Sequence, residues 1–414
     1  MKIVVQKFGG TSTASPQMRE AAVERVRQAI AAGCKPVAVV SAMGRAGEPY
    51  ATDTLKGLAE SVNLQAPLRE LDLIMHCGEI IAAAVMAATL HKAGIRARAF
   101  TGFQAGLQTD GSYGEARVVA CEPGRVRRAL QEGEVPVVAG FQGVDPDGEI
   151  TTLGRGGSDT TAVILGSALP AVQVEIYTDV RGIATADPHI LQEARIIPRL
   201  THSEVCQLVY EGARVIHPPA VEVAMKHNLD LVIRSLTEKD PGTRIHTGAE
   251  VAAAGFSPSP RRVVTGIASA GDIVQLTVEF ALPDPELEMK LFERLAGAGI
   301  SIDLISVFPQ FKIFTIKEES LGRASQVLGE LELSFRVEKN CAKVAVIGFG
   351  MRGIPGVMAR VVRALNEKGI DILQTADSHI SIGLLIRRPD LPAAVETLHS
   401  HFSLGEPEEV PAET

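Results

Sequence analysis

The sequence predicts an α/β protein with a mostly parallel sheet in a large N-terminal part, followed by two smaller α+β modules. Through the first 240 or so residues, apolar strand-like runs alternate with segments of helical periodicity, which is typical of a parallel sheet covered by helices on both faces. Residues 238–262 are rich in proline, glycine and charge, which indicates a boundary. Beyond this boundary the chain repeats itself at an offset of 70 residues, as in Pro285 and Pro355.

Local signals predict the N-terminal elements. A strand begins at Val4, and Ser15 followed by Pro16 is typical of a helix start, with serine as the cap and proline in the first turn. Apolar residues then recur at helical spacing up to Gly33, which suits a C-cap. Further strands are expected at 36–43, 135–141 and 172–177, and an apolar helix at 162–169.

The C-terminal repeat predicts two copies of one small module, each with the order strand, helix, strand, strand, helix. We therefore expect a first domain at 1–240, a linker at 241–262, modules at 263–340 and 341–405, and a tail at 406–414. The pairs that carry the repeat are Pro285 and Pro355, Phe292 and Val362, Leu295 and Leu365, Gly299 and Gly369, Ile302 and Ile372, Leu321 and Leu391, and Leu328 and Leu398.

One glycine cluster favours a different fold when taken alone. Gly348, Gly350 and Gly353 follow an apolar run and match the spacing of a dinucleotide-binding fingerprint. However, the chain that remains after Gly353 is too short for a doubly wound sheet, and the first module has no glycines at the equivalent positions. We interpret the cluster as turn glycines.

Composition excludes several classes of protein. A chain of 414 residues with 46% hydrophobic and 22% charged residues can form two or three folded domains. Its net charge of −8 argues against a nucleic-acid partner. The five cysteines lie far apart, which predicts neither a zinc site nor a disulfide framework. The longest uncharged apolar stretch, 80–90, is about half of a membrane-spanning helix, so we expect a cytoplasmic protein without a membrane partner.

The loop 7–12, with the sequence KFGGTS, joins the first strand to a helix. Adjacent glycines allow backbone N–H groups to form a concave anion site, and a helix N-terminus adds partial positive charge. Lys7 supplies a full charge, which at about 4 Å and an effective dielectric constant of about 20 is worth on the order of 4 kcal/mol before desolvation. A glycine turn beside a solvated lysine is the plainer alternative.

A second glycine pair lies in the loop 154–161, GRGGSDTT, which leads into the apolar helix. In the plainer interpretation, Ser158 or Asp159 caps that helix and Arg155 pairs at the surface. An arginine beside a glycine-lined anion site is more than a cap requires, because the guanidinium group binds carboxylates in a bidentate manner.

A third polar loop, 41–44, follows the second predicted strand, and Thr52, Asp53 and Glu79 lie on the segments after it. Together the three loops predict phosphoryl transfer to a small acid. A carboxylate acceptor has a pKa of about 4 and is already ionised at pH 7, so no general base is needed. Such a site works by neutralising the repulsion between anions and by holding them in line.

Several strings resemble the aspartokinase family across essentially the whole chain. They are KFGGTS at 7–12, SAMG at 41–44, Gly78-Glu79, AGFQG at 139–143, TLGRGGSDTT at 152–161, Thr178-Asp179-Val180 and Thr185-Ala186-Asp187-Pro188. The resemblance implies an amino-acid-kinase, carbamate-kinase-like three-layer sandwich followed by two ACT regulatory modules. It implies transfer from ATP to L-aspartate, giving 4-phospho-L-aspartate for lysine, diaminopimelate, threonine and methionine synthesis. Mg²⁺ is implied with ATP, and no metal held by the protein alone.

The resemblance also implies roles for single residues. Lys7 and Asp159 are expected to be the catalytic pair. The aspartate-binding set is expected to be Ser41, Thr52, Glu79, Arg155 and Ser158, with Glu79 facing the substrate ammonium and Arg155 a carboxylate. The ATP-binding set is expected to be Lys7, Phe8, Gly9, Gly10, Gly156, Gly157, Thr178, Asp179, Asp187 and Arg214.

The chain departs from the family pattern around the nucleotide. Many members carry an aromatic residue, an arginine and a lysine where this chain has Ala184, His189 and Arg214. These departures motivate one alternative, a non-catalytic amino-acid sensor on the same fold. A kinase for glutamate or another acid is a second alternative.

The ACT modules imply feedback by lysine, threonine or meso-diaminopimelate. The segments 41–55 and 374–378 most resemble the diaminopimelate-sensitive class. Because ACT modules usually pair across subunits, a homodimer or homotetramer is expected, with feedback as a shift between two quaternary states. The effector is expected near Asp284, Ser301, Ile302, Asp303, Ile370, Asp371 and Ser378.

Overall fold

The computed structural model describes residues 1–213, 215–247, 263–349, 351 and 354–406. Arg214, most of the expected linker and tail, and Gly350 and Gly353 of the glycine cluster lie outside these residues. The chain forms two compact units. The first comprises Met1–Ile183, Ile196–Cys206 and Arg214–Gly255, and the second comprises Ala184–Arg195, Gln207–Ala213 and Phe256–Thr414.

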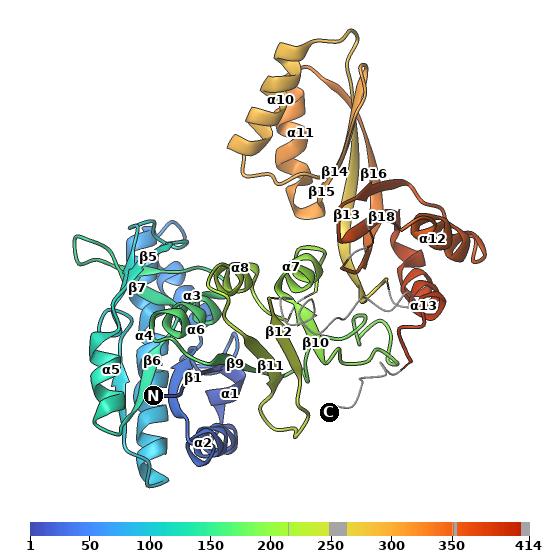
Figure 1. The fold of residues 1–414 in the computed structure, drawn as a ribbon. Helices are drawn as coiled ribbons and strands as arrows, with labels where there is room; N and C mark the ends of the chain where they lie inside the picture. The colour runs from blue at the N-terminus through green and yellow to red at the C-terminus, as the bar shows by residue number, and fades with distance from the viewer. Residues whose placement is uncertain (214, 248–262, 350, 352–353, 407–414) are drawn as a thin grey trace. The chain divides into compact units, whose positions relative to one another are not determined.

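The first unit is a three-layer sandwich around an eight-stranded sheet (Figure 1). Its strands are β1 (Ile3–Phe8), β2 (Lys35–Val40), β3 (Ala97–Phe100), β6 (Val135–Ala139), β9 (Gln173–Thr178), β10 (Arg199–Thr201), β11 (Leu231–Ser235) and β12 (Thr243–His246). They lie in the order β10-β12-β11-β9-β1-β2-β6-β3, and only β11 and β12 pair antiparallel. The sheet is therefore mostly parallel, as the sequence predicts.

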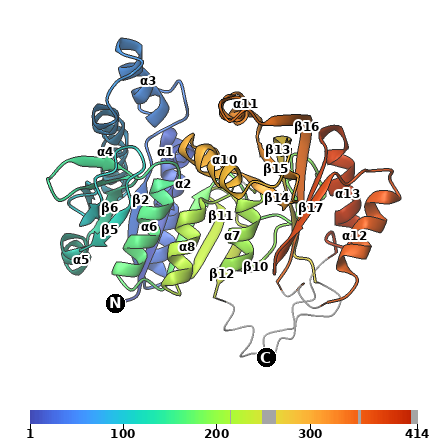
Figure 2. The ribbon, with the colours of Figure 1, turned by 90° about the horizontal axis from the view of Figure 1, so that it is seen from above.

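Helices cover both faces of this sheet. Helices α2 (Pro16–Ala31) and α4 (Leu68–Lys92) bury apolar side chains against Phe8 and Val40 on one face. Helices α6 (Gly157–Ala168) and α8 (Pro218–Lys226) lie side by side on the other face, where Gly166 approaches Val5 (Figure 2). Since strand side chains alternate, Phe8 faces α2 and α4 whereas Lys7 faces α6.

The remaining elements of this part are shorter. A separate small sheet has the order β5-β4-β7-β8. Helix α7 crosses between the two units, because its residues up to Cys206 belong to the first and those from Gln207 to the second. The elements are α1 (Gly10–Ala14), α3 (Thr52–Val62), β4 (Leu107–Thr109), β5 (Val118–Cys121), α5 (Gly124–Gln131), β7 (Gln142–Val144), β8 (Ile150–Thr152) and α7 (His202–Tyr210).

Helix starts follow the local sequence in one case and depart from it in another. Ser15 caps α2, since its Oγ accepts a hydrogen bond from the Met18 N–H at 3.2 Å, and Pro16 opens the helix. The plainer interpretation of the second loop, in which Ser158 or Asp159 caps α6, is wrong. The cap position is Gly156 with φ +70°, and no side chain makes a cap hydrogen bond there. Ser158 and Asp159 lie in the first turn instead.

The expected linker at 241–262 begins too early. Thr243–His246 forms β12 inside the large sheet. Thr243 is fully buried, and its Oγ1 accepts from the Ile183 N–H at 2.9 Å and donates to the Ile197 carbonyl at 2.7 Å. Because these bonds need Thr243 in the sheet, the first unit extends past residue 240.

Helix α4 is long and apolar enough, by length and composition alone, to span a membrane. Ala82, Met86 and Leu90 instead lie in the core formed with α2 and the sheet. The helix is therefore a buried core helix of the first unit.

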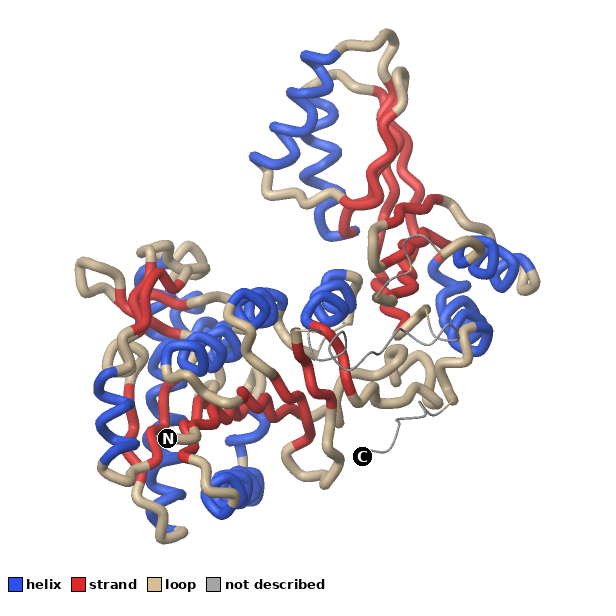
Figure 3. The backbone as a smooth tube through the Cα atoms, viewed as in Figure 1, coloured by secondary structure: helices blue, strands red, loops and turns tan. Residues whose placement is uncertain are grey.

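The second unit carries a six-stranded antiparallel sheet in the order β14-β15-β13-β16-β18-β17 (Figure 3). Helices α10 and α11 bury one apolar cluster against it, and α12 and α13 another. The elements are β13 (Gly266–Glu279), α10 (Pro285–Gly297), β14 (Asp303–Val307), β15 (Phe311–Lys317), α11 (Leu321–Glu330), β16 (Ser334–Ile347), α12 (Val357–Asn366), β17 (Gln374–Asp377), β18 (Ser381–Arg387) and α13 (Leu391–His401).

The two modules share the long strands β13 and β16. Residues 266–270 of β13 pair with 343–347 of β16, and Ile267 packs in the α12–α13 cluster. After a register shift, residues 273–279 pair with β15, and Val274 packs in the α10–α11 cluster. The expected boundary at 263 is therefore wrong for residues 264–270, which complete the second module. The segment after residue 340 supplies only part of β16, β17 and β18, so that module takes its fourth strand from β13.

Candidate active site

An ion pair joins the ends of β1 and α6. The Lys7 Nζ lies 2.7 Å from Oδ1 of Asp159, and the two side chains are 13% and 11% exposed. Lys7 reaches this position because it is on the α6 face of β1, and Asp159 because it is in the first turn of α6. A Cβ added to Gly9 would lie 3.6 Å from the Lys7 Nζ, so the ammonium group sits directly beside the first glycine loop.

The first and third loops are in backbone contact. A Cβ at Gly10 would lie 2.6 Å from the Ala42 carbonyl oxygen and 2.7 Å from that of Gly44. The Gly44 N–H donates to the Gly10 carbonyl at 3.0 Å, and the Ser41 N–H donates to the Phe8 carbonyl at 3.1 Å. Only glycine fits at position 10, because any side chain would separate the two loops.

Glu79 points from α4 toward the third loop. Its Oε1 accepts from the Ala42 N–H at 3.2 Å and from the Thr52 hydroxyl at 3.3 Å. Its Oε2 is buried without a hydrogen-bond partner among the described residues. The side chain is 2% exposed, and this burial raises the pKa of the Glu79 carboxyl to about 8. A buried carboxylate oxygen without a partner is suited to an ammonium group.

The second loop packs tightly before α6. A Cβ at Gly140 would lie 2.8 Å from the Ser158 Oγ, and one at Gly157 would lie 2.8 Å from the Leu153 Cβ. Ser158 is buried, whereas Arg155 is exposed. Among the described residues, the Arg155 guanidinium has no hydrogen bond or ion pair, which leaves its donors available to a carboxylate.

His217 is a neighbour of the second loop that the sequence analysis did not identify. A Cβ on Gly156 would lie 2.2 Å from the His217 Cβ, so the histidine packs directly on that glycine. Burial lowers the pKa of His217, Asp159 raises it and Arg155 lowers it further. Its Nδ1 is buried without a partner in the described part of the chain. A lone histidine has no spacing pattern, and only Pro218, which opens α8 after it, marks the position in the sequence.

The residues expected around the nucleotide are distributed over both units. Thr178 ends β9, and its hydroxyl donates to Asp179 at 3.1 Å. Asp179 also pairs at 2.8 Å with Arg45, which directly follows the third loop. Asp187 belongs to the second unit, where it accepts from the His189 N–H at 2.9 Å. The parts of Asp187 and Arg214 in nucleotide binding stay predictions.

The aromatic ring of Phe8 is stacked on Tyr177 of β9. The ring centroids are 5.2 Å apart, with an interplanar angle of 8°. Phe8 is therefore a core residue on the face opposite Lys7, and its part in nucleotide binding stays a prediction.

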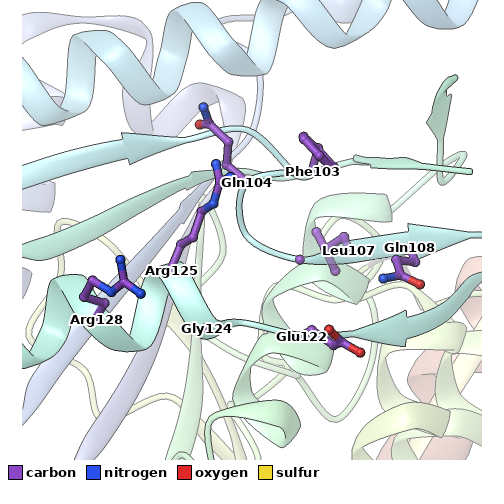
Figure 4. A pocket seen from close by; sticks show the side chains of 9 residues that line it. Phe103, Gln104, Leu107, Gln108, Glu122, Gly124, Arg125 and Arg128 are labelled. Atoms are coloured by element: carbon purple, nitrogen blue, oxygen red, sulfur yellow. The ribbon is translucent and has the colours of Figure 1, made fainter. Parts of the chain in front are cut away.

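A surface pocket of about 370 Å³ lies apart from these loops. It is lined by Phe103, Gln104 and Leu107 together with Arg125 and Arg128 of α5 (Figure 4). None of the expected site residues lines it. The loops between strands and helices of the large sheet, rather than this pocket, carry the groups suited to phosphoryl transfer.

Family models match both parts of the chain. The amino acid kinase family model matches residues 2–235, and an ACT domain model matches residues 336–400. Aspartokinase 1 of Bacillus subtilis strain 168 is 41% identical over 407 residues, which cover 98% of this chain and 100% of that protein. This chain belongs to the aspartokinase family. The aspartokinase of Geobacillus stearothermophilus is 39% identical over 412 residues, covering 98% of each chain.

Solved aspartokinases share the fold of both parts. E. coli aspartokinase III in complex with aspartate and ADP, in the R-state, has a TM-score of 0.76 and 25% identity, covering 97% of this chain and 99% of that one. The structure of the same enzyme with lysine and aspartate, in the T-state, also has a TM-score of 0.76 and 25% identity. The match covers 97% of this chain and 100% of that one. The protein is thus an aspartate kinase, a phosphotransferase that uses ATP and a carboxyl acceptor, with allosteric ACT regulation.

Proposed function

We propose that the three loops around Lys7 and Asp159 are the place where the terminal phosphoryl group of ATP passes to the side-chain carboxylate of L-aspartate. The observation that carries this proposal is the 2.7 Å ion pair at the end of β1, beside the glycines of the first and second loops. A cation held among backbone N–H groups is the arrangement that phosphoryl transfer requires.

In the proposed reaction, a carboxylate oxygen of aspartate forms a bond to phosphorus while the bond to the ADP oxygen breaks. No proton has to leave the acceptor, because the carboxylate is ionised at neutral pH. Lys7 offsets the negative charge shared between acceptor and phosphoryl group. Asp159 holds the ammonium group of Lys7 in position through their ion pair. Asp159 is thus an orienting group rather than a base.

The proposed acceptor subsite uses Glu79 and Arg155 as opposite charges. The free, buried Oε2 of Glu79 receives the substrate ammonium, and the exposed guanidinium of Arg155 receives a carboxylate. Ser41, Thr52 and Ser158 line the space near them as polar groups. Glutamate has one more methylene than aspartate, so a comparison of the two acceptors measures how closely this subsite sets the length of the substrate.

Mg²⁺ is proposed to enter with the nucleotide. In the part of the chain that the structure describes, no group of three or more His, Cys, Asp or Glu residues is placed to hold a metal ion. Mg²⁺ usually keeps several waters and is bound by one or two carboxylates plus substrate phosphates, so the proposed ion does not require a group of three protein ligands. When bound, the ion supplies further neutralisation of phosphate charge.

The proposal is tested by trapping the acyl phosphate. Purified enzyme with Mg-ATP and aspartate should yield aspartyl hydroxamate when hydroxylamine is added. Lys7→Ala is expected to lower turnover at least tenfold, about 1.4 kcal/mol of barrier. Clear binding of amino acids without any hydroxamate would instead support the non-catalytic sensor, and faster reaction with glutamate would change the acceptor.

We further propose that the ACT modules bind an amino acid effector near Asp284, Asp303 and Ser378. E. coli aspartokinase III has been solved with lysine, and the segments 41–55 and 374–378 favour diaminopimelate for this chain. Asp284 caps α10 through the N–H groups of Glu286 and Leu287. We propose a homodimer or homotetramer in the cytoplasm. Activity measured with lysine, threonine and diaminopimelate, singly and in pairs, tests the effector, and light scattering tests the oligomer.

A further inference from the structure

The segment 207–213, here called the connector, joins helix α7 to the ACT sheet. The connector contains the last residues of α7. That helix begins in the first unit, whereas the connector belongs to the second unit. The N–H groups of Glu211, Gly212 and Ala213 close its last turn by donating to carbonyls of residues 207–209 at 2.9 to 3.1 Å. His217, four residues after the connector in the sequence, precedes α8 and packs on Gly156 of the second active-site loop.

Three strands of the ACT sheet hold the connector. The Gln207 side chain donates to the Ser381 Oγ of β18 at 2.8 Å, and Glu211 pairs with Lys343 of β16 at 2.6 Å. Gly212, with φ +123°, lies so close to β13 that a Cβ would be 2.3 Å from the Ser269 carbonyl oxygen. The strands β13, β16 and β18 are neighbours in the sheet. The connector is therefore docked at three consecutive strands within one compact unit.

Lys343 is shared between the connector and a residue expected to bind the effector. Its Nζ lies 2.6 Å from the Glu211 carboxylate and 2.5 Å from that of Asp303. Lys343 and Glu211 are 9% and 8% exposed, whereas Asp303 is 59% exposed. One ammonium group thus serves two carboxylates, one facing solvent and one buried. The excess negative charge favours a further cation at the exposed end.

A second route leads from the connector to another expected effector residue. The Ser381 Oγ that accepts from Gln207 is 2.9 Å from the Ser378 Oγ. Gln207 also donates to Glu211 at 2.8 Å, so both routes meet in the connector. Asp303 and Ser378 come from different ACT modules, and each is one side chain away from a connector contact.

We propose that the connector carries the binding of an amino acid effector to the active-site loops, with Lys343 as the group that changes partners. This proposal rests on the proposed regulation at Asp303 and Ser378. The ammonium group of the effector competes for the Asp303 carboxylate, which leaves Lys343 to pair with Glu211 alone. The tighter Glu211 pair shifts the position of the connector, and the shift alters how His217, four residues further along the sequence, packs on Gly156. A coupling of this kind requires that the effector favour one of two states of the connector.

Glu211→Gln tests the proposal, because it keeps the shape of the side chain and removes its charge. Hydroxamate formation is measured against lysine, threonine and meso-diaminopimelate, and binding of the same compounds by calorimetry. Inhibition at saturating effector, where any change in affinity no longer matters, is expected to fall to less than half of the wild-type value, while the effector-free kcat and KM stay within about threefold. Gln207→Ala, which removes the Ser381 contact, is a second variant. It should likewise lose inhibition while keeping its effector-free kcat and KM, and it keeps the proposal testable if Glu211→Gln does not fold.

Glu338→Gln is the matched control. It breaks an ion pair with Arg387 at 2.9 Å between the same strands β16 and β18, with side chains 45% and 55% exposed. Inhibition of this variant should match the wild type. Equal inhibition of wild type and Glu211→Gln would overturn the coupling alone. A wild type that binds none of the three compounds and is inhibited by none would overturn the proposed regulation, and the coupling with it.

Discussion

Glu79→Gln is expected to stabilise the ligand-free enzyme while it weakens aspartate binding. The carboxyl group is buried in α4 and its pKa is raised from 4.5 to about 8, chiefly by desolvation. Folding at neutral pH therefore requires Glu79 to take up a proton, and folding above pH 8 buries its negative charge. Glutamine keeps an acceptor oxygen for the Ala42 N–H and the Thr52 hydroxyl but has no charge to bury. The variant loses the partner that we propose for the substrate ammonium.

The magnitude follows from the two pKa values. A rise from 4.5 to about 8 corresponds to about 5 kcal/mol at about 1.4 kcal/mol per unit, as an upper limit. Because the folded pKa is raised, stability from this group is fully present below pH 4.5 and is lost as the pH rises to about 8. By pH 7 about 3 kcal/mol of it is lost. The wild type should therefore lose more stability than Glu79→Gln between pH 5 and pH 8.5.

The assay combines thermal unfolding without ligands at pH 5 and pH 8.5 with the KM for aspartate at both values. The wild type must release a proton from Glu79 to bind the ammonium group, so its KM should rise by up to tenfold per unit below pH 8. The KM of the variant should be at least tenfold higher than that of the wild type at pH 8.5 and nearly independent of pH. A variant that is no more stable than the wild type at pH 8.5, or that has an unchanged KM, would refute this account of Glu79.

Asp72→Asn is the matched control on the same helix. Asp72 is also fully buried, but its oxygens accept from the Gly114 N–H at 2.9 Å, the Thr152 N–H at 2.8 Å and the Thr152 hydroxyl at 2.7 Å. Asparagine would place an NH₂ group against one set of these donors, so this variant should lose about 1 to 3 kcal/mol of unfolding free energy. Opposite effects from two buried carboxylates of α4 separate unsatisfied charge from satisfied hydrogen bonding.

Three further predictions concern the proposed reaction. Asp159→Asn should lower kcat at least tenfold with the KM for aspartate changed much less, because it removes the ion pair that holds Lys7; steady-state kinetics would contradict this if kcat were unchanged. Gly10→Ala should lower the melting temperature and the activity together, since its Cβ would lie 2.6 Å from the Ala42 carbonyl oxygen. The control Gly33→Ala has no atom within 4 Å of its Cβ, so it should affect stability only through the φ of +74° and leave activity unchanged. Removal of Mg²⁺ with EDTA should abolish hydroxamate formation, and added Mg²⁺ should restore it; activity that persists in EDTA would count against Mg-ATP as the donor.

Local chemistry allowed much of the first unit to be predicted. The Ser15 cap needs only Met18, three residues away, and the strand that ends at Phe8 follows from its own apolar run. The approach of Lys7 to Asp159 could be expected, because strand ends of a parallel sheet meet at one edge. The raised pKa of Glu79 could not be predicted from the sequence, because it depends on how α4 packs against the third loop.

The errors arose where distant segments decide the structure. Residues 266–270 and 273–279 belong to the single strand β13, yet they pair with different halves of β16. Thr243 lies in a stretch rich in proline and glycine, and only its bonds to Ile183 and Ile197 reveal that it is part of a sheet. His217 escaped notice because its partner, Gly156, is far away in the sequence.

The shared strand β13 makes the first ACT module an insertion within the second. Ala270 and Lys343 are direct partners across the sheet, one just before the first module and the other just after it. Excision of the residues between them and closure by a short hairpin would leave the second module with all of its strands. Removal of the chain after residue 340 would instead leave residues 266–270 of β13 without their partners on β16. The two ACT modules therefore cannot be exchanged as consecutive segments of sequence. A recombinant chain that preserves folding needs one junction before the first module and another after it.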